Sequence, residues 1–324
     1  MQSFFKTMFS MFVLVAGLLA TGSALAEEKR LAYLVSDERI PFWNIMEKGI
    51  KRQAERLGYE VSVYSADNEA KRELELTVEA IESGVEGIIL SPTNSSAAVT
   101  ILKLAERSNV PVVISDIGAD SDNYVSYIAS DNYQGAYDLG DVLASKLEAK
   151  GWADGTVGIV AIPQKRANGQ ARTKGFLQAL EERGIRSADI FQQNDFSYQE
   201  TYQFSRALIA RNSDLRAIWL QGSDRYQAAL DAIADAGRAG EVLLICFDAE
   251  PEFIEMIGAQ ELVGAGMQQP FLMGEKAVET MDAHLQGKRV QKTQQLPVLA
   301  VSGENLEELL PTIRRNVLGQ ETED

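Results

Sequence analysis

Residues 84–116 read GVEGIILSPTNSSAAVTILKLAERSNVPVVISD, and the rest of the chain repeats the pattern of this stretch. Two short apolar runs, Gly87–Ser91 and Val112–Ser115, are typical of buried strands. Between them, Ser95–Ser108 has apolar residues at helical spacing, and Ser95 stands near the helix start. A strand, a helix and a second strand in this order predict a right-handed βαβ unit with parallel strands.

The same alternation extends in both directions along the chain. Further strands are predicted at Leu31–Ser36, Glu60–Ser65, Tyr124–Ala129, Thr156–Ile162, Asp189–Gln193, Ala217–Gln221, Val242–Asp248 and Leu262–Met267. Helical stretches are predicted at Pro41–Leu57, Glu69–Ser83, Asn168–Arg183, Tyr198–Arg211, Ser223–Ala236 and Glu252–Gly258. One sheet of nine or ten parallel strands would be large, so we expect two α/β domains with a sheet each. The first crossing between them is expected at Ser130-Asp131-Asn132.

The first 26 residues are typical of a secretion signal. Lys6 precedes the apolar run Met8–Ala20, which is too short to span a bilayer, and Ala24-Leu25-Ala26 fits a cleavage site. A membrane anchor, the alternative, needs a longer apolar run. The only cysteine, Cys246, is far from this site and cannot carry a lipid there. We therefore predict cleavage after Ala26 and release into a bacterial periplasm.

Composition excludes several partners. The formal net charge is −16, and it becomes −17 when Lys6 leaves with the signal. Such a surface repels nucleic acid and anionic membrane, so neither is expected as a partner. A single cysteine cannot form an intramolecular disulfide, so stability must come from hydrophobic cores. About 300 mature residues are enough for two such cores, and we expect a monomer.

The sequence offers little for catalysis. The only histidine, His284, lies in the helical stretch Val278–Leu285, so a Ser-His-Asp or Cys-His site has no base. One histidine and one cysteine exclude the common zinc and copper sites. No Gly-x-Gly-x-x-Gly follows the first strand, and no Walker-type motif occurs. We expect no catalytic residue, no metal and no cofactor, which favours a binding protein.

Polar and aromatic residues follow the predicted strands. Carboxylates can accept hydrogen bonds from the hydroxyl groups of a polyol, an arginine can donate to its oxygens, and aromatic rings can pack on its C–H faces. Open α/β sheets bind ligands at the carboxyl ends of their strands. The residues there are Ser36, Phe42, Trp43, Asp116, Arg172, Phe196, Asp248 and Gln268. Each one alone is also compatible with a structural role; Arg172, for example, could pair with Glu181 or Glu182.

The chain resembles the ribose-binding-protein family of type I periplasmic binding proteins over nearly its full length. The resemblance is carried by Pro41-Phe42-Trp43, Leu57-Gly58-Tyr59, Gly87–Thr93, Val110–Val113, Ile128–Asn132, Ala171–Phe176 and Cys246-Phe247-Asp248. It implies two Rossmann-like domains, each a parallel sheet flanked by helices, joined by three hinge crossings. The implied lobes are 27–129 with about 269–297, and 130–268 with about 298–324. The implied ligand contacts are Ser36, Phe42, Trp43, Ser91, Asp116, Arg172, Phe196, Gly222, Asp248 and Gln268.

Three departures from the ribose pattern bear on the ligand. Ile40 stands where that pattern has Asn, and Ile117 stands where it has Arg. Gly222 stands where that pattern has a second Asn, although shifting the alignment by one residue would place Ser223 at this position. Ribose hydroxyls facing isoleucines would lack partners, so we predict a deoxy, methyl-bearing or otherwise less hydroxylated ligand. Alternatively, Glu38, Asn94 or ordered water replaces the lost polar groups, and an ordinary pentose or hexose fits.

The leading interpretation is a periplasmic receptor without catalytic activity that closes on a small sugar-like ligand. Its membrane partner would be an ABC permease, or a sensor such as a histidine kinase or chemoreceptor. The alternative is a periplasmic glycosidase or esterase that uses Asp116 and Asp248. A DNA-binding regulator of related fold would need a helix-turn-helix where this chain has its signal.

Overall fold

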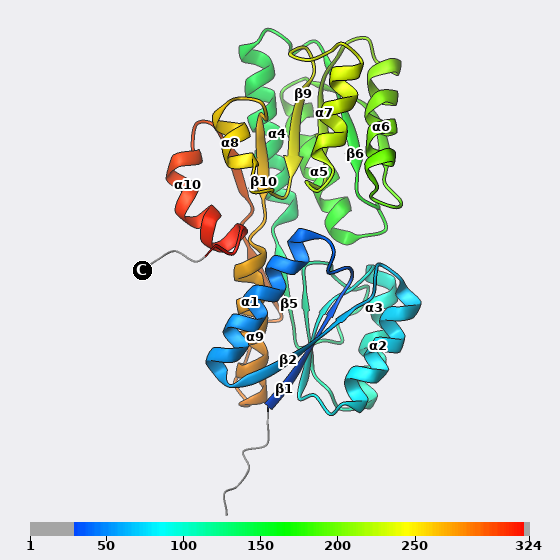
Figure 1. Cartoon of the computed structure of the whole chain (residues 1–324), viewed down its shortest axis with the longest axis vertical. Helices are drawn as coiled ribbons and strands as arrows, with labels where there is room; N and C mark the ends of the chain where they lie inside the picture. The colour runs from blue at the N-terminus through cyan, green and yellow to red at the C-terminus, as the bar shows by residue number, and fades with distance from the viewer. Residues whose placement is uncertain (1–28, 321–324) are drawn as a thin grey trace, which may run out of the picture.

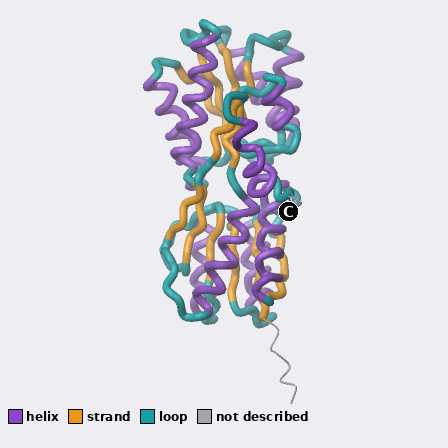
Figure 2. Tube along the Cα trace, turned by 90° about the vertical axis from the view of Figure 1, so that its left-hand side faces the viewer, coloured by secondary structure: helices purple, strands orange, loops and turns teal. Residues whose placement is uncertain are grey.

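The computed structural model describes residues 29–320, which form two lobes joined by a narrow waist (Figures 1 and 2). The predicted leader lies outside the described residues. Each lobe contains one six-stranded sheet. Within residues 29–320, no helix is both long enough and apolar enough to cross a bilayer.

The lower lobe in Figure 1 is built from the first part of the chain and one later helix and strand. Its strand order is β11-β5-β4-β3-β1-β2. The strands are β1 (Lys29–Val35), β2 (Tyr59–Ser65), β3 (Gly87–Ser91), β4 (Val112–Ser115), β5 (Ser126–Ser130) and β11 (Thr293–Leu296). One face of the sheet packs on α1 (Pro41–Leu57) and α9 (Pro270–Leu285), and the other packs on α2 (Ala70–Glu82) and α3 (Ser95–Arg107).

The upper lobe repeats this plan, with strand order β12-β10-β9-β8-β6-β7. The strands are β6 (Thr156–Ala161), β7 (Arg186–Gln192), β8 (Leu215–Leu220), β9 (Leu243–Phe247), β10 (Gly264–Met267) and β12 (Leu299–Ser302). The helices are α4 (Asn132–Ala149), α5 (Ala167–Glu182), α6 (Tyr198–Arg211), α7 (Tyr226–Asp235), α8 (Phe253–Gly258), α10 (Leu306–Thr312) and the π-helix η1 (Ile313–Val317). Helices α4 and α5 cover one face, and α6, α7 and α8 cover the other.

The prediction of two helix-flanked α/β domains is confirmed, with one correction. All strand pairs are parallel except β10 with β12, which is antiparallel. β11 is parallel to β5 and, like it, ends at the waist. The chain continues from there into β12, which starts at the waist and runs away from it. β10 runs toward the waist, so β12 is antiparallel to β10.

Local sequence explains where helices α1 and α4 begin and where α1 ends. Pro41 occupies the first turn of α1, where its missing N–H costs nothing, and Gly58 ends that helix with a left-handed φ of 77°. The side chain of Asp131 caps α4 by accepting a hydrogen bond from the Gln134 N–H. This cap places the start of α4 directly after β5, where the chain leaves the lower sheet.

The chain passes between the sheets three times, between β5 and α4, β10 and α9, and β11 and β12. Hydrogen bonds tie these crossings together. The Asp131 N–H donates to the Leu296 carbonyl at 2.9 Å, and Gln269 Nε2 donates to the Pro297 carbonyl at 2.8 Å. The C-terminal segment adds a further link, because Arg315 forms an ion pair with Glu275 of α9 at 2.8 Å.

Candidate ligand-binding site

A cavity lies between the lobes, where strands of both sheets end. The lower lobe lines it with Ile40, Pro41, Phe42, Trp43 and Asp116. The upper lobe lines it with Ile162, Arg166, Asn168, Arg172, Phe196, Gly222, Ser223, Asp224, Asp248, Glu250 and Gln268. Eight of the ten residues predicted for the site therefore line one cavity, and both residues proposed for the Gly222 position do so.

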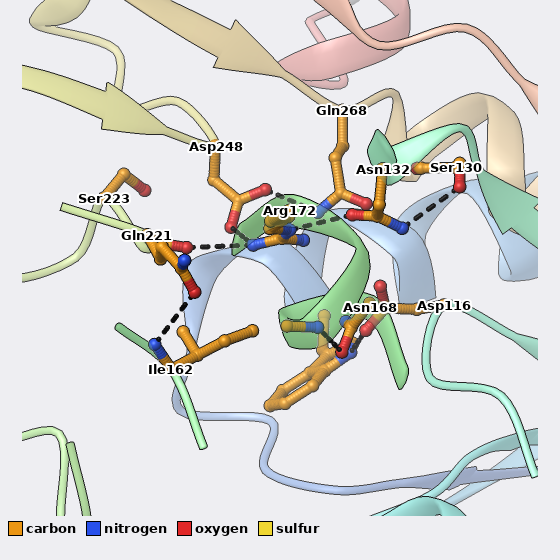
Figure 3. A network of polar contacts seen from close by, with 12 residues as sticks. Asp116, Ser130, Asn132, Ile162, Asn168, Arg172, Gln221, Ser223, Asp248 and Gln268 are labelled. Atoms are coloured by element: carbon orange, nitrogen blue, oxygen red, sulfur yellow. Dashed lines mark hydrogen bonds and ion pairs between the residues drawn. The ribbon is translucent and has the colours of Figure 1, made fainter. Parts of the chain in front are cut away.

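Arg172 is the centre of the polar network on the upper side (Figure 3). Its side chain is buried, and Nε donates to Asn132 Oδ1 at 2.7 Å. Nη1 donates to the Gln221 carbonyl at 2.9 Å and to Asp248 Oδ2 at 3.5 Å. The guanidinium also lies 3.9 Å from the centre of the Phe247 ring. These contacts hold Arg172 in one orientation, and its carboxylate partner is Asp248 rather than Glu181 or Glu182.

Asp248 follows β9 with a left-handed φ of 68°, and its N–H donates to the Gly266 carbonyl. Its Oδ1 accepts from Gln268 Nε2 at 2.5 Å. Burial raises the pKa of Asp248, while Arg172 and Gln268 act to lower it. Gln268 Oε1 is buried and has no hydrogen-bond partner among the described residues. This atom is available to accept from a ligand.

Asp116 is the lower-lobe counterpart of Asp248. It follows β4, has the same φ of 68°, and its N–H donates to the Ile128 carbonyl. Oδ2 accepts from Trp43 Nε1 at 3.2 Å, whereas Oδ1 is buried without a partner in the described chain. Burial raises the pKa of Asp116 to about 6, with Arg172 the largest opposing influence. A ligand hydroxyl group that donates to Oδ1 would satisfy this carboxylate.

Aromatic rings approach the cavity from both lobes. Phe42 and Trp43 meet edge to face, with ring centres 6.2 Å apart and planes at 80°. Phe196 adopts a left-handed φ of 55°, and its N–H donates to Glu200 Oε2 at 3.0 Å. Such rings supply apolar faces against which the C–H surface of a sugar can pack.

Two residues predicted for the site lie outside the cavity lining. Ser36 and Ser91 are fully buried; the Ser36 hydroxyl donates to Asn68 Oδ1, and the Ser91 hydroxyl pairs with Tyr33 and Ser115. Both serines stand at strand ends, but their hydroxyl groups bond within the lower lobe.

The expectation that Ile117 faces the site is wrong. Its side chain is fully buried in the core between the lower sheet and α1 with α9. The left-handed turn at Asp116 brings the aspartate to the cavity and the next residue into the core. Ile40 does line the cavity. Of the proposed polar replacements, Asn94 caps α3 and Glu38 is exposed, and neither is part of the lining.

Arg166, Asn168, Asp224 and Glu250 also line the cavity but were not predicted. Each follows a strand end, as the predicted residues do, but none falls on a contact position implied by the resemblance. The Glu250 carboxylate accepts from Ser223 Oγ at 2.7 Å, and burial raises its pKa to about 7. Asp224 pairs with Arg225 at 3.0 Å. Residues 29–320 contain no cluster of three or more potential metal-ligating side chains.

Comparison with known proteins gives the same fold and a family. A model of the periplasmic binding protein domain matches residues 31–289. The chain is 30% identical over 280 residues to the ribose import binding protein of Escherichia coli K12, covering 86% of this chain and 93% of that protein. It is 25% identical over 284 residues to the D-allose-binding periplasmic protein of the same organism, covering 85% and 90%.

Solved structures share the two-lobed fold. A carbohydrate transporter solute binding protein from Agrobacterium radiobacter, in complex with D-arabinose, superposes with a TM-score of 0.82 at 22% identity, covering 90% of this chain and 99% of that one. At 22% sequence identity, a shared fold does not establish a family. The domain model spans well over half of the chain, and the protein therefore belongs to the periplasmic binding protein domain family.

Proposed function

We propose that this protein is a periplasmic receptor that closes its lobes on a small neutral sugar and delivers it to an ABC permease. The observation that carries the proposal is the cavity between the lobes, where Arg172, Asp248 and Asp116 meet aromatic rings. Relatives across most of the chain are named for ribose import and for D-allose binding. Their names support a sugar as the ligand class.

The donors and acceptors of the cavity suit hydroxyl groups. Asp116 Oδ1 and Gln268 Oε1 are buried acceptors without partners in the described chain, and a hydroxyl group can donate to each. Arg172 is held in place before any ligand arrives, so little side-chain freedom is lost on binding. Trp43, Phe42 and Phe196 then pack on the ring of the sugar.

Closure follows from the position of these groups on two lobes. A ligand held by Asp116 from below and by Arg172 and Gln268 from above contacts all three only when the lobes are together. It therefore binds the closed state better and shifts the population toward it. The closed molecule presents one surface made of both lobes, which a permease can distinguish from the open one. A sensor kinase or chemoreceptor would use the same surface.

We propose binding without turnover. A glycosidase would need one carboxyl group as a proton donor and another as a nucleophile or base. Both oxygens of Asp248 accept hydrogen bonds, from Gln268 and from Arg172, which suits a fixed acceptor of ligand hydroxyl groups.

A screen of the mature protein tests the receptor function. D-ribose, D-allose, D-arabinose and their deoxy analogues are each added in a thermal-shift assay, because a ligand bound only by the folded state raises the unfolding midpoint. Hits are measured by calorimetry and by fluorescence, since Trp43 lines the cavity while Trp219 is buried in the upper core. We expect at least one sugar to bind and remain unchanged. Turnover of a glycoside or ester, or no response to any sugar, would contradict the proposal.

Location is tested separately. Osmotic shock should release the protein without detergent, with Glu27 as its first residue. Retention in the membrane fraction would contradict export in free form.

A further inference from the structure

Arg166 differs from Arg172, the other arginine of the cavity, because no carboxylate among the described residues lies within 4.0 Å of it. It occupies the position before the first residue of α5, and only 6% of its surface is exposed. Its Nε atom is buried and has no hydrogen-bond partner in residues 29–320. A buried guanidinium nitrogen without a partner is unfavourable, and here it belongs to a residue that lines the cavity.

The contacts of Arg166 cross from the upper lobe to the lower one. Nη2 donates to Asn68 Oδ1 at 3.1 Å, and Asn68 lies between β2 and α2. The guanidinium carbon lies 5.9 Å from the centre of the Trp43 ring and 5.4 Å from that of Phe196. Burial lowers the pKa of Arg166 to about 10, while Asp116 and Glu73 favour its charged form. The side chain is therefore a cation at neutral pH.

Asn68 is held in place for this contact. Its backbone has a left-handed φ of 63°, its N–H donates to the Ser36 carbonyl at 2.6 Å, and its Oδ1 also accepts from the Ser36 hydroxyl. The Nη2 end of the guanidinium is thus fixed by the lower lobe. The Nε atom, next to the aliphatic part of the side chain, can donate to another acceptor.

Three lining residues now carry buried polar atoms without partners in the described chain: the donor Arg166 Nε and the acceptors Asp116 Oδ1 and Gln268 Oε1. Hydroxyl groups complement this set, because each can donate and accept. The lining contains four carboxyl side chains against two arginines, so an anionic ligand would meet an excess of like charge.

We infer that Arg166 is a ligand-binding residue of the upper lobe, whose Nε donates a hydrogen bond to an oxygen of the ligand. It selects neutral, polyhydroxylated ligands that place an acceptor oxygen at Nε. The inference rests on the proposed receptor function and names a specificity-determining residue for it.

The test compares R166M with K165M by calorimetry on the mature protein. Met keeps the apolar stem of Arg166 but removes its charge and donors, and Lys165 is an exposed neighbour whose replacement changes the charge equally. The probes are D-ribose, D-allose, D-arabinose, their monodeoxy analogues, D-gluconate and D-galacturonate. R166K, which keeps a charge and a donor, covers the case in which R166M does not fold.

For the sugar that binds the wild type best, we expect R166M to weaken binding at least tenfold, R166K less, and K165M less than twofold. For one monodeoxy analogue, the factor by which it binds more weakly than its parent sugar should be at least fivefold smaller in R166M than in the wild type. A merely structural role of Arg166 would not produce this effect. The inference would be overturned if the ratio of the dissociation constants of each deoxy analogue and its parent sugar were unchanged in the Arg166 variants. It would also be overturned if a sugar acid bound more tightly than every neutral sugar. Failure of every probe to bind the wild type would overturn the receptor function as well.

Discussion

The two walls of the cavity are built on different principles. The lower wall is apolar and aromatic, with Asp116 as its single charged group. The upper wall carries Arg166, Arg172, Asp224, Asp248 and Glu250.

The walls also differ in how firmly their polar groups are held. Arg172 has hydrogen-bond partners on three other residues of its own lobe, whereas the Asp116 carboxylate accepts one hydrogen bond, from Trp43. The upper wall therefore orients the ligand before closure. The lower wall adds an apolar cover and one acceptor when the lobes come together.

Removing Arg172 should have the largest effect, because it breaks the more organised wall. We expect R172A to weaken sugar binding by roughly 2–4 kcal/mol, about 30- to 1000-fold. The free energy of unfolding should also fall, because Asp248 keeps its burial but loses its cation. Calorimetry and thermal unfolding measure the two effects. R183A is the control, since Arg183 at the end of the same helix pairs only with partly exposed carboxylates. A loss smaller than that of any lower-wall variant would reverse the comparison.

Replacing Asp116 should come second. We expect D116N to weaken binding by about 1–3 kcal/mol, since an amide oxygen is a weaker acceptor than a carboxylate. Wild-type affinity should fall as the pH drops through about 6, where the carboxyl group takes up a proton, and D116N should reduce this dependence. Calorimetry from pH 5 to 8 tests both statements, and parallel pH profiles for the two proteins would refute the role of Asp116.

Asp116 should strengthen ligand binding but lower the stability of the unliganded protein at neutral pH. Burial raises the pKa of Asp116 above its value of 3.8, so the folded state binds the proton more tightly than the unfolded state. The contribution of Asp116 to the free energy of unfolding therefore decreases as the pH rises from about 4 to about 6. At pH 7 without ligand, D116N should unfold at a higher temperature than the wild type. A lower midpoint at pH 7 would contradict this.

Trp43 separates the two functions of the lower wall. W43F keeps an aromatic face but removes the indole N–H that donates to Asp116 at 3.2 Å. We expect binding to weaken by roughly 1 kcal/mol, about fivefold. The midpoint of the pH dependence should move upward, because this hydrogen bond lowers the pKa of Asp116. Calorimetry at several pH values measures both, with F42L as a variant that changes the ring next to Trp43 and leaves the hydrogen bond.

Ile40 should give the smallest effect. We propose that it favours a deoxy or methyl-bearing edge of the ligand, and that I40N shifts the preference toward the hydroxylated sugar by at most about 1 kcal/mol. The ratio of the dissociation constants of ribose and 2-deoxyribose measures this shift. Stronger discrimination against ribose in I40N would oppose the idea.

The sequence predicted most of the fold because its signals are local. Residues 84–116 contain a complete βαβ unit, and the structure places β3, α3 and β4 there. Strands β11 and β12 were missed because each has only four residues, and β11 has a single apolar residue, Leu296. They exist because the chain returns along the edge of each sheet on its way through the waist.

The site was predictable as far as it depends on strand ends. Arg172, Asp248 and Gln268 were found because each follows or faces the end of a strand in one lobe. Arg166 was missed because its contacts with Asn68 and Trp43 depend on how the two lobes meet. The orientation of Ile117 could not be predicted, because it depends on the left-handed turn at Asp116, and position along the chain does not reveal such a turn.

That left-handed backbone also restricts how this cavity can change by mutation. At Asp116 and Asp248, with φ of 68°, Asn is tolerated almost as well as Asp, whereas longer or β-branched residues strain the turn. Ile40 and Arg166 have extended backbones that accept almost any side chain. Single mutations can therefore exchange a carboxylate for an amide at the two aspartates, while new sizes and shapes of ligand must be accommodated through Ile40 and Arg166.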